Sequence, residues 1–438
     1  MIAEGHSTYY LTYALVCAAL LVTYVRIKST EGVTITTKEF RIFQSGFITG
    51  YAAMILCELL SIASFYHTFV SLNLSLEKIT NLYIVTIIST TVFGVLAEIA
   101  DVGGKRDKCV LSAVLYAISM FTILIGTHYE MHLFGRIIYG AASALHHSIF
   151  EAYVIHEHTI LGFPDDWLTQ TFTILTHAMA LVAAIAGPAG QTASSSSTYG
   201  CVGLCFSLFA LVAVYITLAW SKDSGANRFM LSGFLFNVNS TVQSARASKQ
   251  VLYTLGISTL SESSITIFTF FWAPWLASMV PEKDRETLPY EIIFSCYVCA
   301  SMLGNYMYQL QSASSGSDAA FQTILIATCG AFFAGGVFQT SVMAFAISIF
   351  IQLCIGGYWP SIGYLRGRCV APELRSTALA LCRVATLVIS AFLLRSIHHS
   401  PLLMLSSCAA LMGVAAYLQN VLIVEGLTGE LVDEEADQ

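Results

Sequence analysis

The sequence predicts an all-α integral membrane protein built from two six-helix halves and one extra N-terminal helix. Apolar residues make up 56% of the 438 residues and charged residues only 11%, whereas soluble domains carry about 25% charged residues. Thirteen stretches are apolar over a membrane-spanning length, and Lys and Arg concentrate on alternate connections between them. The mean hydropathy of +0.71 excludes a soluble enzyme. Since 20 Lys and Arg stand against 27 Asp and Glu, the charge excludes a nucleic-acid binder.

Each predicted span is a run of mostly apolar residues near the length of about 20 that crosses a bilayer as a helix. The runs lie at 8–27, 42–65, 80–100, 109–127, 132–155, 169–191, 200–220, 249–277, 291–310, 319–339, 342–365, 376–395 and 401–423. Polar intervals then suggest the following organisation. We expect an anchor helix and linker at 1–41, a six-helix half at 42–220, a cytosolic loop at 221–248, a second half at 249–424 and an acidic, disordered tail at 425–438.

The distribution of cations predicts the orientation of these spans. Arg26 and Lys28 follow the first run, and no Lys or Arg precedes it, so we interpret it as an uncleaved anchor rather than a signal peptide. With the N-terminus outside, fourteen of the 20 Lys and Arg lie on cytosolic connections and four on external ones. Cytosolic loops of membrane proteins carry such an excess of Lys and Arg. The C-terminus is therefore predicted to be cytosolic.

Two six-helix halves joined by a cytosolic loop are the layout of the major facilitator superfamily. Asp101, followed by two glycines, Lys105 and Arg106, resembles the signature loop of that superfamily. We interpret these three residues as a gate, in which Asp101 sits near a helix N-terminus and the cations stay at the cytosolic rim. The alternative is a basic turn that only fixes orientation.

A closer resemblance is carried by longer runs. These are Phe-Glu-Ala-Tyr-Val-Ile-His-Glu-His at 150–158, Phe-Pro-Asp-Asp-Trp at 163–167, Ser-Glu-Ser at 261–263 and Gly-Tyr-Trp-Pro-Ser at 357–361. The chain resembles the molybdate-anion transporter family over about residues 40–400. The resemblance implies uptake of molybdate, a divalent tetrahedral oxyanion, across the cell membrane by a protein without a cofactor, and we expect a monomer. His67 departs from the family pattern, where Lys is expected.

Ionisable residues inside the spans are the candidate binding residues, because such groups are expensive in a membrane and usually face a cavity. Arg136, His147 and Glu151 fall within about 60° on one helix face. Arg136 suits either oxyanion binding or a structural ion pair. Arg383, in the middle of its span, is the favoured cation for an anionic substrate.

The remaining predicted site residues are uncharged or acidic. Tyr297, Asn305 and Trp359 are expected to line the polar path. Glu58, Glu151 and Glu262 would repel an anion if all were ionised. Because burial favours the protonated form of a carboxyl group, we expect one or more of them to take up a proton with the anion.

No metal site is predicted. His146 and His147 are adjacent and are expected on different helix faces, and His156 and His158 do not converge on a helix. We interpret the latter two as solvated or interfacial. No Walker, zinc-protease or nucleophile-elbow motif is present, so an enzyme is not expected. The sequence favours a secondary transporter of molybdate or a similar oxyanion; the alternatives are a carrier of another small polar solute and a non-transporting receptor or scaffold.

Overall fold

The computed structural model describes residues 2–30, 36–101, 104–222, 228–229, 231–338, 340–397 and 399–436. Within this part of the chain it contains fifteen α-helices. The helices form two compact units. Unit 1 comprises Met1–Met230 with Lys283–Cys299, and unit 2 comprises Leu231–Glu282 with Ala300–Gln438.

The elements of unit 1 are α1 (Ile2–Thr30), α2 (Lys38–Ala63), α3 (Phe65–Ser71), α4 (Leu76–Ile99), β1 (Ala100–Asp101), α5 (Lys105–Ile125), α6 (Tyr129–Ile160), α7 (Asp165–Ser196), α8 (Gly200–Ala219), β2 (Arg228–Phe229) and the start of α11 (Tyr290–Ser315). The elements of unit 2 are α9 (Leu231–Ala247), α10 (Lys249–Ser278), the remainder of α11, α12 (Ser317–Val337), α13 (Ser341–Cys369), the short 3₁₀ helix η2 (Pro372–Leu374), α14 (Arg375–Ile397) and α15 (Pro401–Ala436). A second 3₁₀ turn, η1 (Glu282–Asp284), lies where the chain passes from unit 2 to unit 1.

The all-helical membrane fold predicted from the sequence is confirmed. Among the described residues, a long helix covers most of each of the thirteen predicted runs, and ten helices are long and apolar enough to cross a membrane by length and composition. The other long helices, α6, α10 and α11, have 32, 30 and 26 residues. They exceed the length of about 20 that a span requires, and they carry many of the polar residues discussed below.

Two predicted segments differ from expectation. The interval 221–248 is more than a loop, because it contains β2, which pairs antiparallel with β1 through Asp101 and Arg228, and the helix α9. Helix α15 continues to Ala436, so the backbone of the predicted tail is helical over residues 425–436. The side chains beyond Gly426 lie outside the described residues.

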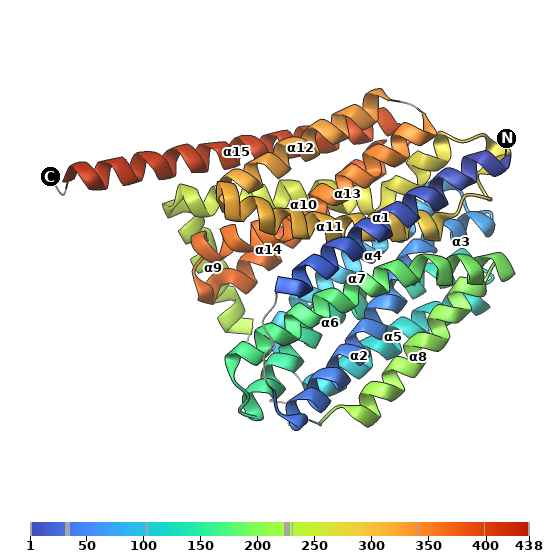
Figure 1. Cartoon of the computed structure of the whole chain (residues 1–438), viewed down its shortest axis with the longest axis horizontal. Helices are drawn as coiled ribbons and strands as arrows, with labels where there is room; N and C mark the ends of the chain where they lie inside the picture. Colours follow the sequence, from blue (N-terminus) through green and yellow to red (C-terminus); the bar gives the residue numbers. More distant parts are fainter. Residues whose placement is uncertain are drawn as a thin grey trace. The chain divides into compact units, whose positions relative to one another are not determined.

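Close helix packing in unit 1 depends on small residues. Helix α6 packs against α4 and α5, and α5 also packs against α8, beside which it runs in Figure 1. A Cβ atom on Gly140 would lie 2.5 Å from Cβ of Ser89, and Ser89 donates a hydrogen bond to the carbonyl of Ile137 at 2.6 Å. Glycine is therefore required where α6 crosses α4, since small residues let helix backbones approach within a membrane.

The start of α11 belongs to unit 1 because it packs tightly on α7. The hydroxyl of Ser295 donates a hydrogen bond to the carbonyl of Ala183. A Cβ atom on Gly187 would lie 2.6 Å from Cβ of Ser295. Unit 1 therefore differs from the predicted half at 42–220, which placed all of this helix in the second half.

Unit 2 is built in the same way. Helix α15 runs beside α12 and also packs against α10 (Figure 1). On α11 and α13, Gly304 and Gly356 bring the two backbones together, because a Cβ atom on either would overlap a carbonyl oxygen of the other helix.

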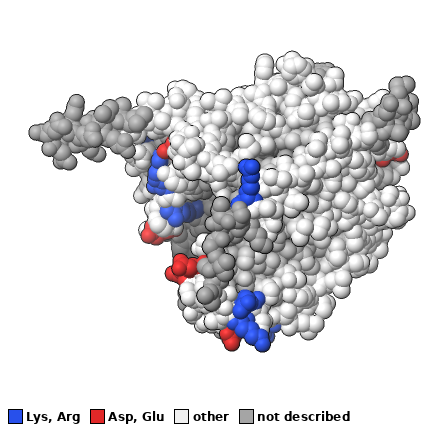
Figure 2. Space-filling view, in the orientation of Figure 1, with Lys and Arg blue, Asp and Glu red and all other residues white. Residues whose placement is uncertain are grey.

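Many large apolar side chains are exposed on the surface. Figure 2 shows that most of the visible surface is formed by residues other than Lys, Arg, Asp and Glu. Large apolar side chains such as Leu218, Leu310 and Phe392 are 81%, 73% and 68% exposed. Lipid tails accept such surfaces, and the helices satisfy their own backbone polar groups. The chain is a multi-pass membrane protein.

Candidate functional site

A buried carboxylate occupies the core of unit 1. Glu58 lies on α2, where it is 9% exposed. Its Oε1 accepts a hydrogen bond of 2.9 Å from the hydroxyl of Tyr116 on α5, and its Oε2 lies 3.3 Å from Nε2 of His146 on α6. The sequence predicts an inward-facing Glu58 but not these partners. The helix crossings bring them together from positions 58 and 88 residues farther along the chain.

His147 also reaches Glu58. Its Nε2 lies 3.7 Å from Oε1 of Glu58, although its side chain is 55% exposed. The expectation that His146 and His147 serve different faces is therefore wrong at the level of the imidazole rings. The Cα–Cβ bonds of adjacent helical residues point about 100° apart, but two long side chains can both reach one carboxylate.

Among the described residues, Glu58, His146 and His147 are the group that presents three metal-type ligand atoms within 4.8 Å of one another. A histidine that ligates a metal almost always donates its other ring N–H to an acceptor. Nδ1 of His146 is buried and has no hydrogen-bond partner in this part of the chain. The unpartnered Nδ1 therefore departs from the second contact that a metal-ligating histidine usually makes.

Arg136 is the buried cation of unit 1. It lies on α6, is 5% exposed, and donates a hydrogen bond of 2.8 Å from Nε to Oγ1 of Thr86 on α4. Its guanidinium carbon lies 4.6 Å and 4.0 Å from the ring centroids of Phe65 and Tyr139. No carboxylate of the described residues lies within the 4.0 Å ion-pair distance. Arg136 is thus held by aromatic faces and one hydroxyl, without a neutralising anion.

Aromatic rings connect Arg136 to Glu58. The hydroxyl groups of Tyr139 and Ser61 lie 2.8 Å apart, and the rings of Tyr139 and Tyr116 pack edge to face with centroids 4.8 Å apart. Because Tyr116 donates to Glu58, one continuous chain of contacts runs from the guanidinium to the carboxylate.

The predicted stripe of Arg136, His147 and Glu151 is divided in the structure. Arg136 faces the core, whereas His147 and Glu151, one helical turn apart, are both exposed. The two groups at the far end of the stripe are therefore exposed, and the cation is buried.

In unit 2, Glu262 of α10 is paired with Arg366 of α13. Nη2 of Arg366 donates to Oε1 of Glu262, and Nε donates to Oγ of Ser258 at 3.1 Å. Positive-inside counting places Arg366 at the cytosolic rim and so misses this role. The available signal is that a carboxylate within a span requires a partner.

The other predicted binding residues are dispersed. Arg383 is exposed and forms no ion pair or hydrogen bond with any described residue. Tyr297 is fully buried, Asn305 is half-buried, and Trp359 is 50% exposed. Only Glu262 among the predicted residues of unit 2 is joined to a basic side chain, and that side chain is Arg366 rather than Arg383.

Sequence reasoning also misses Glu291, at the start of α11. It is fully buried in unit 1, where Oε1 accepts a hydrogen bond of 2.5 Å from Ser194 and lies 3.4 Å from Nδ1 of His67. Its Oε2 has no hydrogen-bond partner among the described residues. Because Glu291 is the first residue of a predicted run, the sequence suggests an acid at the membrane interface. The available signal was its neighbour His67, which departs from the family pattern.

Parts of the predicted gate and of the histidine run are also placed. Asp101 lies in β1, but its side chain is outside the described residues; Lys105 and Arg106 begin α5, and Arg106 pairs with Asp107 at 2.9 Å. His158 is buried rather than solvated, because Nε2 contacts the carbonyl of Pro164 at 3.0 Å and its ring packs among aromatic side chains.

The sequence profile of a family described as sugar transporters with twelve transmembrane helices matches residues 8–355. Proteins named molybdate-anion transporter are similar over most of their length. The one from Takifugu rubripes is 25% identical over 422 residues, covering 87% of this chain and 85% of its own. The one from Danio rerio is 25% identical, covering 89% and 86%.

Solved structures with a similar fold are also transporters. The nucleoside transporter NupG superposes with a TM-score of 0.65 at 13% identity, covering 88% of this chain and 99% of NupG. A D-xylose–proton symporter superposes with a TM-score of 0.65 at 12% identity, covering 86% and 97%. At these identities the likeness establishes the fold alone.

Proposed function

Because the chain belongs to the family of twelve-helix transporters whose profile it matches, within the major facilitator superfamily, we propose that it carries molybdate or a similar small oxyanion. Its similarity to proteins named molybdate-anion transporter supports this substrate, as the sequence motifs already implied. Transport rather than catalysis is the activity we assign. The protein acts as a monomer in the cell membrane, with its N-terminus outside and its C-terminus cytosolic.

The observation that carries this proposal is the unneutralised guanidinium of Arg136. A charge buried in a membrane protein without a partner is strongly unfavourable. An arriving oxyanion supplies the missing negative charge, and the planar guanidinium matches its oxygens. A neutral sugar would leave the charge uncompensated, so the site favours an anion over the sugars named in the family description.

The carboxylates Glu58, Glu151 and Glu262 are proposed to carry protons. Glu58 stands beside His146, and Glu262 beside Arg366. In this proposal one or more of the three carboxylates takes up a proton from the solution with the anion, so anion and proton move together.

The remaining predicted residues have supporting roles in this proposal. Arg383, Asn305, Tyr297 and Trp359 contact the substrate during its passage. Asp101, Lys105 and Arg106 open and close the path at the cytosolic side as the protein alternates between outward-open and inward-open forms.

The experiment is uptake of labelled molybdate by cells expressing the chain, with tungstate, sulfate and xylose as competitors. Tungstate should compete strongly and xylose should not. Arg136→Gln should lower the uptake rate at least 10-fold, since a single charged hydrogen-bonded contact is worth about 1.5–3 kcal/mol. Lys78→Gln, which removes an exposed cation of unit 1, is the matched control and should retain uptake. Unchanged uptake by Arg136→Gln at equal surface expression would refute the proposal.

A further inference from the structure

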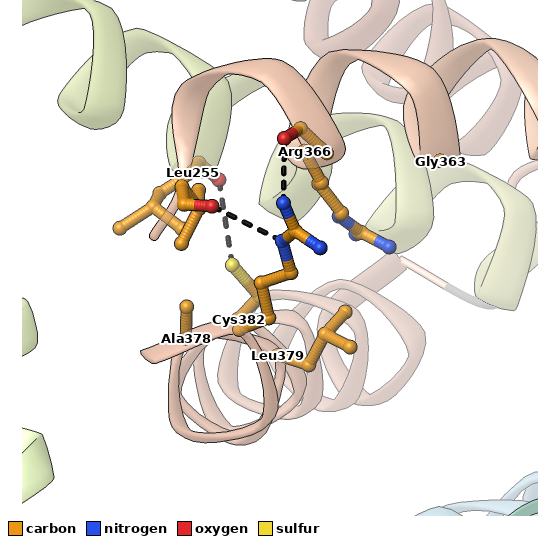
Figure 3. Close-up of a pocket in the computed structure, with 9 residues that line it drawn as sticks. Leu255, Gly363, Arg366, Ala378, Leu379 and Cys382 are labelled. Atoms are coloured by element: carbon orange, nitrogen blue, oxygen red, sulfur yellow. Dashed lines mark hydrogen bonds between the residues drawn. The ribbon is translucent and has the colours of Figure 1, made fainter. Parts of the chain in front are cut away.

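A cavity of about 250 Å³ lies within unit 2, where α13 ends and α14 begins. Figure 3 shows Gly363 and Arg366 of α13 on one side, Ala378, Leu379 and Cys382 of α14 on another, and Leu255 of α10 beside them. The thiol of Cys382 contacts the carbonyl of Leu255 at 3.7 Å, which fixes α14 against α10. Three packed helices, α10, α13 and α14, therefore form the cavity.

Two guanidinium groups, Arg366 and Arg375, are the charged side chains that line this cavity, and no carboxylate lines it. Arg366 uses Nε and Nη2 for Ser258 and Glu262. Arg375 uses Nε and Nη2 for the carbonyls of Val370 and Gly367, at 3.1 Å and 2.6 Å. Neither residue has another hydrogen bond within the described chain, so each keeps its Nη1 group for a further acceptor.

The two guanidiniums differ in charge balance. Arg366 is neutralised by Glu262, whereas Arg375 contacts only backbone carbonyls at the end of α13 and no carboxylate of the described residues. Carbonyl oxygens at a helix C-terminus orient a cation but cancel only part of its charge. The cavity therefore carries a net positive charge at its wall.

The remaining wall is apolar or open. Leu255, Ala378 and Leu379 supply apolar surface. A Cβ atom on Gly363 or Gly367 would meet nothing within 4 Å, so both glycines leave room at the cavity side of α13. A ligand that combines a compact anion with an apolar stem matches this lining.

We infer that the cavity binds a tetrahedral oxyanion group, such as the phosphate of a membrane lipid or a free phosphate-type ion, between Arg366 and Arg375. Guanidinium groups bind phosphate oxygens through charge-assisted hydrogen bonds. On the predicted topology this end of unit 2 faces the cytosol, where the leaflet is rich in anionic lipids. The site goes beyond the proposed transport function, in which the transported oxyanion binds Arg136 of unit 1 and Arg366 serves as the partner of Glu262.

The test is binding to the purified full-length chain after removal of co-purified lipid. Native mass spectrometry would compare phosphatidic acid with diacylglycerol, which lacks the phosphate, and calorimetry would measure inorganic phosphate. The chain should bind phosphatidic acid or inorganic phosphate, and diacylglycerol should not bind. Arg375→Gln and the cavity-filling Gly363→Leu should each weaken that binding at least 10-fold. Arg368→Gln is the matched control, since Arg368 pairs with Asp318 at 2.6 Å and does not line the cavity.

Binding of phosphatidic acid alone would identify the source as lipid, and binding of inorganic phosphate would identify a free ion; both support the inference. Because Gly363→Leu leaves the arginines in place, it keeps the test valid if Arg375→Gln disturbs the end of α13. The inference fails if neither ligand binds, or if both variants bind like the unmodified chain. These measurements require no transport, so their failure is separate from failure of the transport proposal.

Discussion

At the scale of single residues, the candidate functional groups include charged side chains that are buried among the helices. Arg136 and Glu58 were predicted from the sequence as buried charges within spans, because such groups rarely persist there without a role. Their partners were not predictable. The contacts of Glu58 with Tyr116 and His146 depend on helix crossings that no spacing within one helix encodes.

Glu291 shows that the burial of a residue at a helix end was also not predictable from the sequence. Its place at the start of α11 suggests an interfacial residue, yet Ser194 and His67 enclose it in unit 1. Which end residues become buried depends on how far a neighbouring helix extends past them, and α7, with 32 residues, reaches Ser194 beside Glu291.

A residue-scale prediction concerns the pair Glu262 and Arg366. Removing one partner of a buried ion pair costs about 3–5 kcal/mol, because it leaves an uncompensated charge. Glu262→Gln and Arg366→Gln should therefore each lower the free energy of unfolding more than the double variant does. Thermal unfolding of the purified chains in detergent measures this. Breaking the exposed pair of Arg368 and Asp318 should cost at most about 1 kcal/mol. Additive losses in the double variant would contradict the assignment.

At the scale of elements, apolar run length predicted the helices well. Most of each of the thirteen runs lies within a long helix, because a membrane leaves a helix as the only simple way to satisfy the backbone. The amphipathic helix α9 was missed, since its polar residues resemble a loop when only long apolar runs are counted. The grouping of the start of α11 with unit 1 was also missed, because it depends on Gly187 and Gly190 of α7, which lie against Ser295 and Glu291.

The element-scale prediction compares one substitution at two glycines of unit 1. Gly187→Ala places a methyl group 2.6 Å from Cβ of Ser295, so we expect overpacking to destabilise the protein by about 1–3 kcal/mol. Gly203→Ala on α8 meets nothing within 4 Å and should be neutral or stabilising by up to about 1 kcal/mol. Thermal unfolding of both variants measures this difference in stability. Equal effects at the two positions would show that α7 and α11 do not pack this closely.

At the scale of the whole molecule, each unit carries a carboxylate on the first core helix of a predicted six-helix half, with a basic neighbour from another helix. Glu58 on α2 contacts His146 of α6, and Glu262 on α10 pairs with Arg366 of α13. Arg136, which is buried in unit 1, pairs with no carboxylate of the described residues. Proton and anion binding are thus assigned to different side chains of one protein.

The most direct test of the central claim is uptake of labelled molybdate into sealed liposomes that contain the purified chain. We predict accumulation well above that of protein-free liposomes, further acceleration by an inwardly directed proton gradient, and loss of that acceleration in Glu58→Gln or Glu262→Gln. Arg136→Gln liposomes should accumulate at least 10-fold less molybdate. Equal accumulation in protein-free liposomes and in those with the unmodified chain would contradict the account.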